Sequence, residues 1–295
     1  MFYKLRDWVV VDKLNWSLLT YNPNAVHMIE TNLDKVRWDF LSFNENAIPI
    51  LEKRIDKVDW RWLSMNPNAI RMIEQNLDKV DWMRLSQNPN AIPILEKNLD
   101  KICWKQLSNN PNAVHIVEQN MDKVNWMYLS QNPNAIPILE KNLDKVDWLW
   151  LCRNPNAIPI LEQNMDKVDW YWLCENTNAI HLLEKNLDKV DWCTLSYNSN
   201  AISILEKNLH RVNWISLCYN PGAISILEKN LDKVSWSALS KNPSIFTYDY
   251  QKMREITMKP GGLAEQLAAT VFHPERLHRL CKQYNIEFDE LLEIY

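Results

Sequence analysis

Glutamate is the side chain whose spacing most suggests chemistry. In this chain of 295 residues it recurs every 22 residues, at Glu30, Glu52, Glu74, Glu96, Glu118, Glu140, Glu162, Glu184, Glu206 and Glu228. General acid–base catalysis needs two carboxyl groups in different environments, so that their pKa values separate, whereas a regular ladder gives every Glu the same surroundings. We therefore expect a structural role for these carboxylates, such as bonding to a neighbouring indole N–H, a backbone N–H or a Lys.

The histidines are too scattered for a metal site. Those that share a position of the pattern lie four and three repeats apart, at His27, His115 and His181. Near His273, the side chains of His278 and Cys281 can share one helix face, but two ligands on one turn do not make a zinc site. We therefore predict no bound metal.

Cysteine and glycine also argue against catalysis. Three cysteines replace a Ser of the repeated pattern and are predicted to be small packing residues, namely Cys152, Cys174 and Cys218. Six Cys without a C-x-x-C pair are typical of reduced thiols rather than of a disulfide scaffold. Only 3 Gly are present, and the sequence contains neither a G-x-S-x-G motif nor a P-loop. The sequence thus predicts no catalytic residue, no cofactor and no enzyme.

These side chains belong to a repeat of 22 residues. Trp marks it without insertion or deletion, at Trp16, Trp38, Trp60, Trp82, Trp104, Trp126, Trp148, Trp170, Trp192, Trp214 and Trp236. With Trp as position 0, the unit is W-x-x-L-S/C-x-N-P-N-A-I-x-I-L-E-K-N-L-D-K-V-D. Its apolar positions 0, 3, 9, 10, 12, 13, 17 and 20 are predicted to face inward, because such short units are stable only when neighbours stack.

Capping residues predict two short helices in each unit. The residue before Trp is Asp, Asn or Ser in nine of eleven copies, which is typical of an N-cap. Asn at position 6 is expected to end the first helix in the left-handed conformation, and Asn at position 8 to cap the second. Asn at position 16 is expected to end the second helix, again in the left-handed conformation.

The predicted fold class is all-α. We expect an α-solenoid of eleven 22-residue, two-helix repeats over residues 16–243, with an N-terminal cap at 1–15 and a helical C-terminal cap or tail module at 244–295. Stacking at 8–10 Å per packed helix gives a rod or superhelix on the order of 100 Å long. A leucine-rich-repeat β-solenoid is the alternative, but its L-x-L strand core is missing.

Two positions vary while the frame of the repeat stays fixed. Positions 2 and 5 lie three residues apart on the first helix and share one face, so that stacked repeats form a strip. Aromatic and Arg side chains in this strip are the anchor types of protein interfaces. The candidate partner-binding residues are Phe40, Phe43, Trp62, Met65, Tyr128, Trp150, Arg153 and Trp172. The alternative is that these rings pack between repeats.

The repeat also resembles a known family. The segment NPNAIPILEKNLDKICW at 88–104 resembles the short tandem repeats found in many proteins of giant DNA viruses that infect amoebae and related protists. The segment FHPERLHRL at 272–280 is similar to a short helical segment near the C-termini of other such proteins. The resemblance implies viral origin and an all-helical repeat fold, and it carries over no catalytic residue. It implies a location inside the host cell, in the cytoplasm or the viral factory, with the virion as an alternative.

Together these features predict a protein-interaction scaffold or adaptor. Its partner would be an unknown host or viral protein, with self-association as an alternative. A structural spacer or virion component would also fit the regular phasing. A reader of single-stranded nucleic acid is disfavoured by the net charge of −4, and a membrane protein by the lack of any apolar run of 18 residues.

Overall fold

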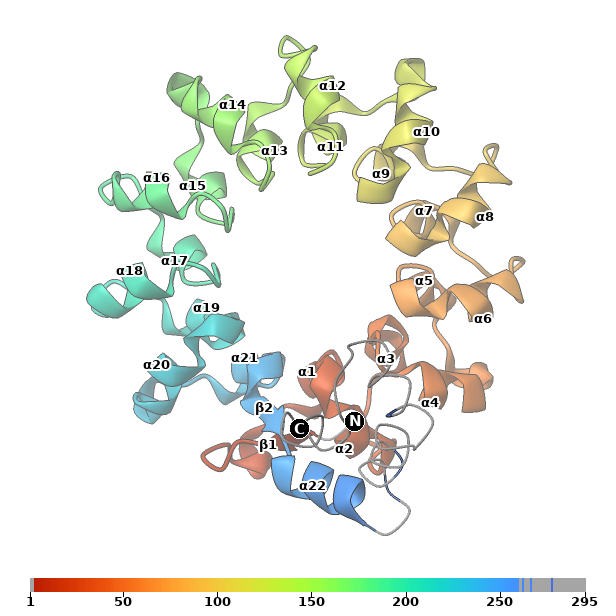
Figure 1. Ribbon diagram of the computed structural model, residues 1–295, viewed down its shortest axis with the longest axis vertical. Helices are drawn as coiled ribbons and strands as arrows, with labels where there is room; N and C mark the ends of the chain where they lie inside the picture. The colour runs from red at the N-terminus through yellow and green to blue at the C-terminus, as the bar shows by residue number, and fades with distance from the viewer. Residues whose placement is uncertain (1–2, 260–261, 263–265, 267–276, 278–295) are drawn as a thin grey trace. The chain divides into compact units, whose positions relative to one another are not determined.

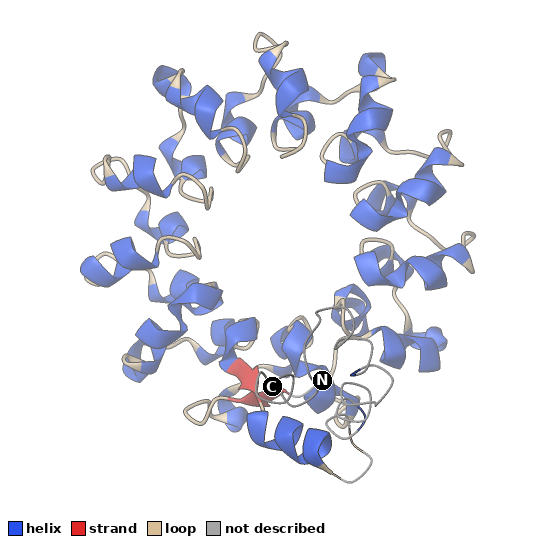
Figure 2. Ribbon diagram, viewed as in Figure 1, coloured by secondary structure: helices blue, strands red, loops and turns tan. Residues whose placement is uncertain are grey.

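The computed structural model describes residues 3–259 together with Gly262, Gln266 and Leu277. These residues are mostly helical, as predicted, and the described strands are β1 (Tyr3–Leu5) and β2 (Phe246–Tyr248), which pair in one small sheet (Figure 2). The chain divides into a main unit, Leu5–Phe246, and a second unit made of Met1–Lys4 and Thr247–Tyr295. In the second unit, α22 (Tyr250–Met258) is the described helix; His273, His278 and Cys281 lie outside the described residues.

A short helix begins at each Trp of the repeat (Figure 1). These first helices are α1 (Trp16–Leu19), α3 (Trp38–Phe43), α5 (Trp60–Leu63), α7 (Trp82–Leu85), α9 (Trp104–Leu107), α11 (Trp126–Ser130), α13 (Trp148–Cys152), α15 (Trp170–Leu173), α17 (Trp192–Leu195), α19 (Trp214–Tyr219) and α21 (Trp236–Leu239). The predicted N-caps are confirmed: the preceding Asp, Asn or Ser accepts a backbone N–H in nine copies, whereas Arg37 and Cys103 do not.

A second helix follows in ten copies. These helices are α2 (Val26–Glu30), α4 (Ile48–Lys53), α6 (Ile70–Glu74), α8 (Ile92–Glu96), α10 (Val114–Glu118), α12 (Ile136–Glu140), α14 (Ile158–Glu162), α16 (Ile180–Glu184), α18 (Ile202–Lys207) and α20 (Ile224–Glu228). Pro49 and its equivalents stand at the second residue of the helix, where a backbone N–H has no intrahelical partner to lose.

The core is formed by Leu at position 3, Ala at position 9 and the apolar residue at position 13, which are fully buried in every copy where the repeat continues, as in Leu85, Ala91 and Leu95. The prediction for position 17 is wrong, because this residue is half-buried or exposed; Ile55 is 47% exposed. It opens the tight turn that leads to the next repeat, and this turn lies on the surface.

Asn at position 6 joins neighbouring repeats instead of adopting the predicted left-handed conformation. Asn88 has φ −72° and ψ 116°, which is extended backbone. Its Nδ2 donates to the carbonyls of Ser64 (3.1 Å) and Asn66 (3.0 Å) in the preceding repeat, and its Oδ1 accepts the N–H of Asn90 (3.0 Å). All eleven copies make the two inter-repeat bonds. Asn is required because one short side chain must supply two donors and an acceptor.

The other two asparagines were also assigned wrong roles. Position 8 does not cap the second helix, because position 6 caps this segment; instead Asn90 donates to the carbonyl of Pro67 in the preceding repeat (3.0 Å). Position 16 is not left-handed either: Asn164 has φ −134°, and its Nδ2 donates to the carbonyl of Ile160 (2.9 Å). The position-8 partner belongs to the preceding repeat, which a sequence pattern does not reveal, whereas the position-16 partner is a carbonyl four residues earlier in the same repeat.

Ser at position 4 supplies a further link between repeats. The Oγ of Ser64 donates to the carbonyl of Trp60 (2.6 Å) and accepts the N–H of Asp81 from the next repeat (3.0 Å). Each standard interface therefore has four bonds from side chains at positions 4, 6 and 8. All of the buried polar atoms involved have partners, which makes the polar core favourable.

The last repeat is bonded to the first in the same way. The Nδ2 of Asn22 donates to the carbonyls of Ser240 (3.3 Å) and Asn242 (2.8 Å). The Nδ2 of Asn24 donates to the carbonyl of Pro243 (3.1 Å), and the Oγ of Ser240 accepts the N–H of Asn15 (2.8 Å). Accordingly, α21 lies beside α1 (Figure 1). The main unit is a closed repeat array without a free end, whereas an open rod or superhelix was predicted.

The N-terminal segment completes the last repeat. Residues 11–15, VDKLN, match the LDKVD end of the repeat, and Val11–Lys13 forms the same tight turn as Ile55–Lys57. The ammonium of Lys13 lies 5.1 Å from the ring of Trp236, as the ammonium of Lys35 lies 4.7 Å from that of Trp16. The part of the chain predicted as an N-terminal cap thus supplies the end of the repeat that begins at Trp236.

Candidate interaction surface

The strip at positions 2 and 5 is positioned by the first helix of each repeat. Because Leu at position 3 and Ser or Cys at position 4 are buried, positions 2 and 5 turn toward the helix surface. All eight predicted residues are half-buried. Each therefore packs on a neighbouring repeat with one side and remains accessible on the other.

One aromatic group spans the first four repeats. The ring of Tyr21 stacks on Phe40, with centroids 4.0 Å apart, and Phe43 meets the edge of Trp62 at 5.9 Å. The guanidinium of Arg84 lies 4.4 Å from the centroid of Trp62. The rings predicted as binding residues thus make contacts between repeats in this group.

A second group spans the repeats that begin at Trp126, Trp148 and Trp170. The rings of Tyr128 and Trp150 stack with centroids 5.5 Å apart. The guanidinium of Arg153 lies 5.3 Å from Trp150 and 4.9 Å from Trp172, and it forms an ion pair of 2.7 Å with Glu175. Cation–π contacts with two indole rings hold Arg153 in place.

Position 1 is a part of the surface that the sequence analysis missed. Met127 is 43% exposed, and Leu149 and Tyr171 are each 49% exposed. Three consecutive first helices, α11, α13 and α15, thus each present an apolar pair at positions 1 and 2. We call this set the apolar patch; it comprises Met127, Tyr128, Leu149, Trp150, Tyr171 and Trp172. Position 1 is Ser, Asp, Arg or Lys in five of the other copies and Met, Cys or Ile in three, so the signal in the sequence is the run of three consecutive copies with a large apolar residue.

The strip is not uniform along the array. The repeats that begin at Trp82 and Trp104 carry polar residues at positions 2 and 5, at Arg84, Gln87, Gln106 and Asn109. This polar stretch therefore divides the predicted residues into two groups. On one side lie Phe40, Phe43, Trp62 and Met65, and on the other lie Tyr128, Trp150, Arg153 and Trp172.

The glutamate ladder lies on a different part of each repeat. The carboxylate of Glu96 pairs with the Nε2 of His115 and that of Glu162 with the Nε2 of His181, each at 2.9 Å, and Lys53 reaches Glu30 at 3.5 Å. These contacts join adjacent second helices. They agree with a structural role for the ladder.

Two buried thiols at position 4 have raised pKa values, so they are not activated as nucleophiles. Burial raises the pKa of the Cys152 and Cys174 thiols to about 11, so both remain protonated at neutral pH. The Sγ of Cys152 takes the place of the Ser oxygen as acceptor of the Asp169 N–H at 3.4 Å. Both thiols are fully buried, as predicted for packing residues.

Two findings concern metal ions and membranes. Among the described residues, no group of three or more His, Cys, Asp or Glu side chains is arranged to hold a metal ion. Within the same part of the chain, no helix combines the length and hydropathy that a bilayer crossing needs.

Comparison with known proteins adds no relative: no family model, curated protein or solved structure matches the chain.

Proposed function

We propose that this chain is a non-enzymatic interaction scaffold or adaptor, an α-solenoid of eleven 22-residue repeats that binds a protein partner through the apolar patch. The observation that carries the proposal is the exposure of Met127, Leu149 and Tyr171 beside the half-buried rings of Tyr128, Trp150 and Trp172. Contiguous exposed apolar side chains on a folded surface are typical of interaction sites.

The composition of the patch favours a protein partner. Trp, Tyr and Met are enriched at protein interfaces, and stacked rings lose little conformational freedom when a partner covers them. Arg153 contacts two indole rings and Glu175, so it adds a fixed charge at the edge of the patch. A spacer would have no use for these exposed apolar groups.

The resemblance of the repeat supports a viral origin, with the host cytoplasm or the viral factory as the place of action. The partner is then a host or viral protein. Single-stranded nucleic acid is a weaker proposal, because Arg153 is already paired and the protein has a net charge of −4.

Affinity purification tests the proposal. The tagged protein is compared with the Leu149→Ser/Tyr171→Ser variant in lysate from infected cells, and retained proteins are identified by mass spectrometry. The matched control is Met83→Ser/Ile215→Ser, which removes two position-1 side chains outside the patch that are 49% and 60% exposed. We expect a specific protein to be retained by the original and the control and lost by the patch variant, with equal circular dichroism for all three. Equal retention by the patch variant would remove the patch as the binding surface.

A further inference from the structure

The strip changes character in the last three repeats. Position 2 is occupied by Trp in three earlier copies, but it is small at Thr194, Ser216 and Ala238, all of which are buried. Position 5 in these repeats carries Tyr197, Tyr219 and Lys241. Without a bulky side chain at position 2, the surface beside the two tyrosines is hollow.

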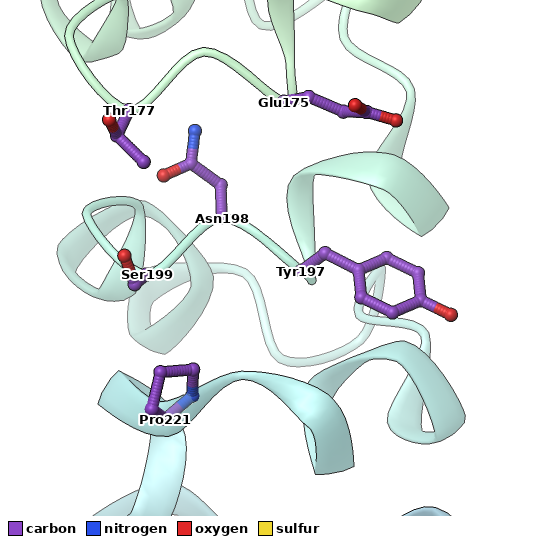
Figure 3. A pocket seen from close by; sticks show the side chains of 6 residues that line it. All are labelled: Glu175, Thr177, Tyr197, Asn198, Ser199 and Pro221. Atoms are coloured by element: carbon purple, nitrogen blue, oxygen red, sulfur yellow. The ribbon is translucent and has the colours of Figure 1, made fainter. Parts of the chain in front are cut away.

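Two cavities occupy this part of the surface and share Tyr197. One, of about 430 Å³, is lined by Glu175, Thr177, Tyr197, Asn198, Ser199 and Pro221 (Figure 3). The other, of about 490 Å³, is lined by Leu18, Tyr197, Tyr219 and Lys241 and therefore crosses the seam between the last and first repeats. We call the combined feature the tyrosine groove. Figure 3 shows the side chains of Glu175 and Tyr197 pointing to the same side.

The tyrosine rings form a platform in this groove. Tyr197 and Tyr219 are stacked, with centroids 5.7 Å apart, and the Tyr197 side chain is 48% exposed. Such a pair offers flat apolar area with hydroxyl groups at its edge, which suits both apolar and polar parts of a ligand.

A backbone carbonyl beside the groove also lacks the side-chain donor that it has in the standard interface. In the standard interface, Asn at position 8 donates to the preceding carbonyl, as Asn200 does to Thr177 at 3.0 Å. In the next repeat this position is Gly222, so the carbonyl of Ser199 receives no such side-chain amide. A Cβ on Gly222 would lie 2.8 Å from that oxygen. The series of position-8 amide bonds is therefore interrupted at Ser199, which lines the cavity. The Ser199 carbonyl can accept an N–H from a ligand.

The two ends of the groove carry opposite charges. Glu175 lies at one end; Arg153 contacts its Oε2, but a carboxylate has room for further donors. Lys241 lies at the other end, with its ammonium 4.6 Å from the ring of Tyr21. Among the described residues, Lys241 takes part in none of the ion pairs that the structure contains.

We propose that the tyrosine groove binds an extended peptide with a basic group at the Glu175 end, an acidic group at the Lys241 end and an apolar or aromatic side chain on the Tyr197–Tyr219 platform. Glu175 and Lys241 are three repeats apart, which at 8–10 Å per packed helix is roughly 24–30 Å. An extended chain covers this distance with about eight residues. Glu175 disfavours the phosphates of a nucleic acid, and the platform and the free carbonyl favour a peptide.

The groove lies outside the apolar patch, and its occupancy does not depend on the function proposed for that patch. The test uses an array of fluorescein-labelled peptides of eight residues, with Lys at one end, Glu at the other and Tyr, Trp or Leu varied between. Each has a counterpart with both charged residues replaced by Gln, and oligothymidine serves as the nucleic-acid probe. Binding to the full-length protein is measured by fluorescence anisotropy.

We expect members of the charged array to bind more tightly than their neutral counterparts. Lys241→Gln and Glu175→Gln should each weaken binding by about two- to fivefold, the range for accessible ion pairs. Ser216→Trp, which copies the Trp found at position 2 in other repeats, should fill the groove and weaken binding by at least about tenfold. The matched control, Gln131→Ala, changes a half-buried position-5 residue far along the array and should leave binding unchanged.

Two results would overturn the proposal. One is an array in which no charged peptide binds better than its neutral counterpart, including the case in which only oligothymidine binds. The other is binding that survives Ser216→Trp; if that variant does not fold, Tyr219→Ala removes half of the platform and takes its place. Neither result bears on the partner captured by the apolar patch, which is tested with Leu149→Ser/Tyr171→Ser, because neither of these residues lines the groove.

Discussion

At the scale of single residues, asparagine explains how the repeat is held together. The sequence predicted that Asn is special because of its backbone, in the left-handed conformation. The structure shows that Asn88 and its equivalents are special because of their amides, which bridge three backbone groups. The pattern could identify the position, but it could not identify partners that belong to the preceding repeat.

Replacing one of these amides should be costly. Asn110→Asp keeps the acceptor for the Asn112 N–H but puts a carboxylate against the carbonyls of Ser86 and Asn88. We expect a loss of about 3 kcal/mol or more in the free energy of unfolding, because buried donors are replaced by a charge. The control is Asn120→Asp, a half-buried position-16 residue that loses one donor, to the carbonyl of Ile116, and whose Oδ1 accepts from Lys123. Equal urea midpoints for the two variants would contradict this role.

The buried thiols predict a pH dependence of stability. The pKa of Cys152 and Cys174 is about 11 in the folded protein and about 9 in an unfolded chain. The unfolded state therefore ionises first, so the contribution of these thiols to the free energy of unfolding should be constant below pH 9 and fall as the pH rises toward 11. Cys152→Ser/Cys174→Ser, which restores the Ser of other repeats, should flatten this part of the urea-midpoint profile. A variant with the same slope as the original protein would exclude these thiols as the cause.

At the scale of elements, helices of four to six residues exist because the repeat interfaces support them. The N-caps at Trp were predictable, since the cap side chain and the backbone N–H that donates to it lie within three residues. The apolar residues at position 1 of three consecutive repeats were also visible in the sequence, but which way position 1 faces depends on the packing of the first helix. The N-cap of the second helical segment was predicted two residues too late. Asn88 and Asn90 are both residues of a type that caps helices, but only Asn88 has the hydrogen bond of a cap.

A missing cap offers a gain of stability. The first helix at Trp104 follows Cys103, which has the extended backbone of an N-cap but no side-chain acceptor. Cys103→Asp should supply this acceptor and raise the free energy of unfolding by about 0.5–1 kcal/mol. Denaturant titration beside Cys103→Ala separates the cap from the loss of the thiol. No difference between Asp and Ala at this position would refute the effect.

At the scale of the main unit, closure depends on every interface at once. The match between VDKLN at 11–15 and the repeat end was visible in the sequence. That the first and last repeats meet was not, because this depends on the bend between successive repeats rather than on any one residue. The tyrosine groove was hidden for the same reason, since its second cavity combines Leu18 with Lys241 across the seam.

Removing the N-terminal segment should open the array. Deletion of residues 1–15 removes the contact of Lys13 with Trp236 and the bond from Asn15 to Ser240. The bonds from Asn22 and Asn24 to the last repeat remain, but the seam is weaker than every other interface, which permits head-to-tail association between copies. We expect mass to increase with concentration in light scattering, whereas Val10→Ser, an exposed change in the same segment, should leave it constant. A deletion variant that keeps its monomer mass at all concentrations would show that the seam holds without the segment.

Closure also restricts how this sequence can change in length. An open solenoid tolerates the gain or loss of a unit, because the neighbours of the new unit are the only ones affected. Here a twelfth unit, or the loss of one of eleven, would leave a gap or an overlap at the bonds between Asn22 and Ser240 unless every other interface adjusted its angle. The number of copies is therefore fixed by closure, and duplication of one unit leads from this architecture to an open one.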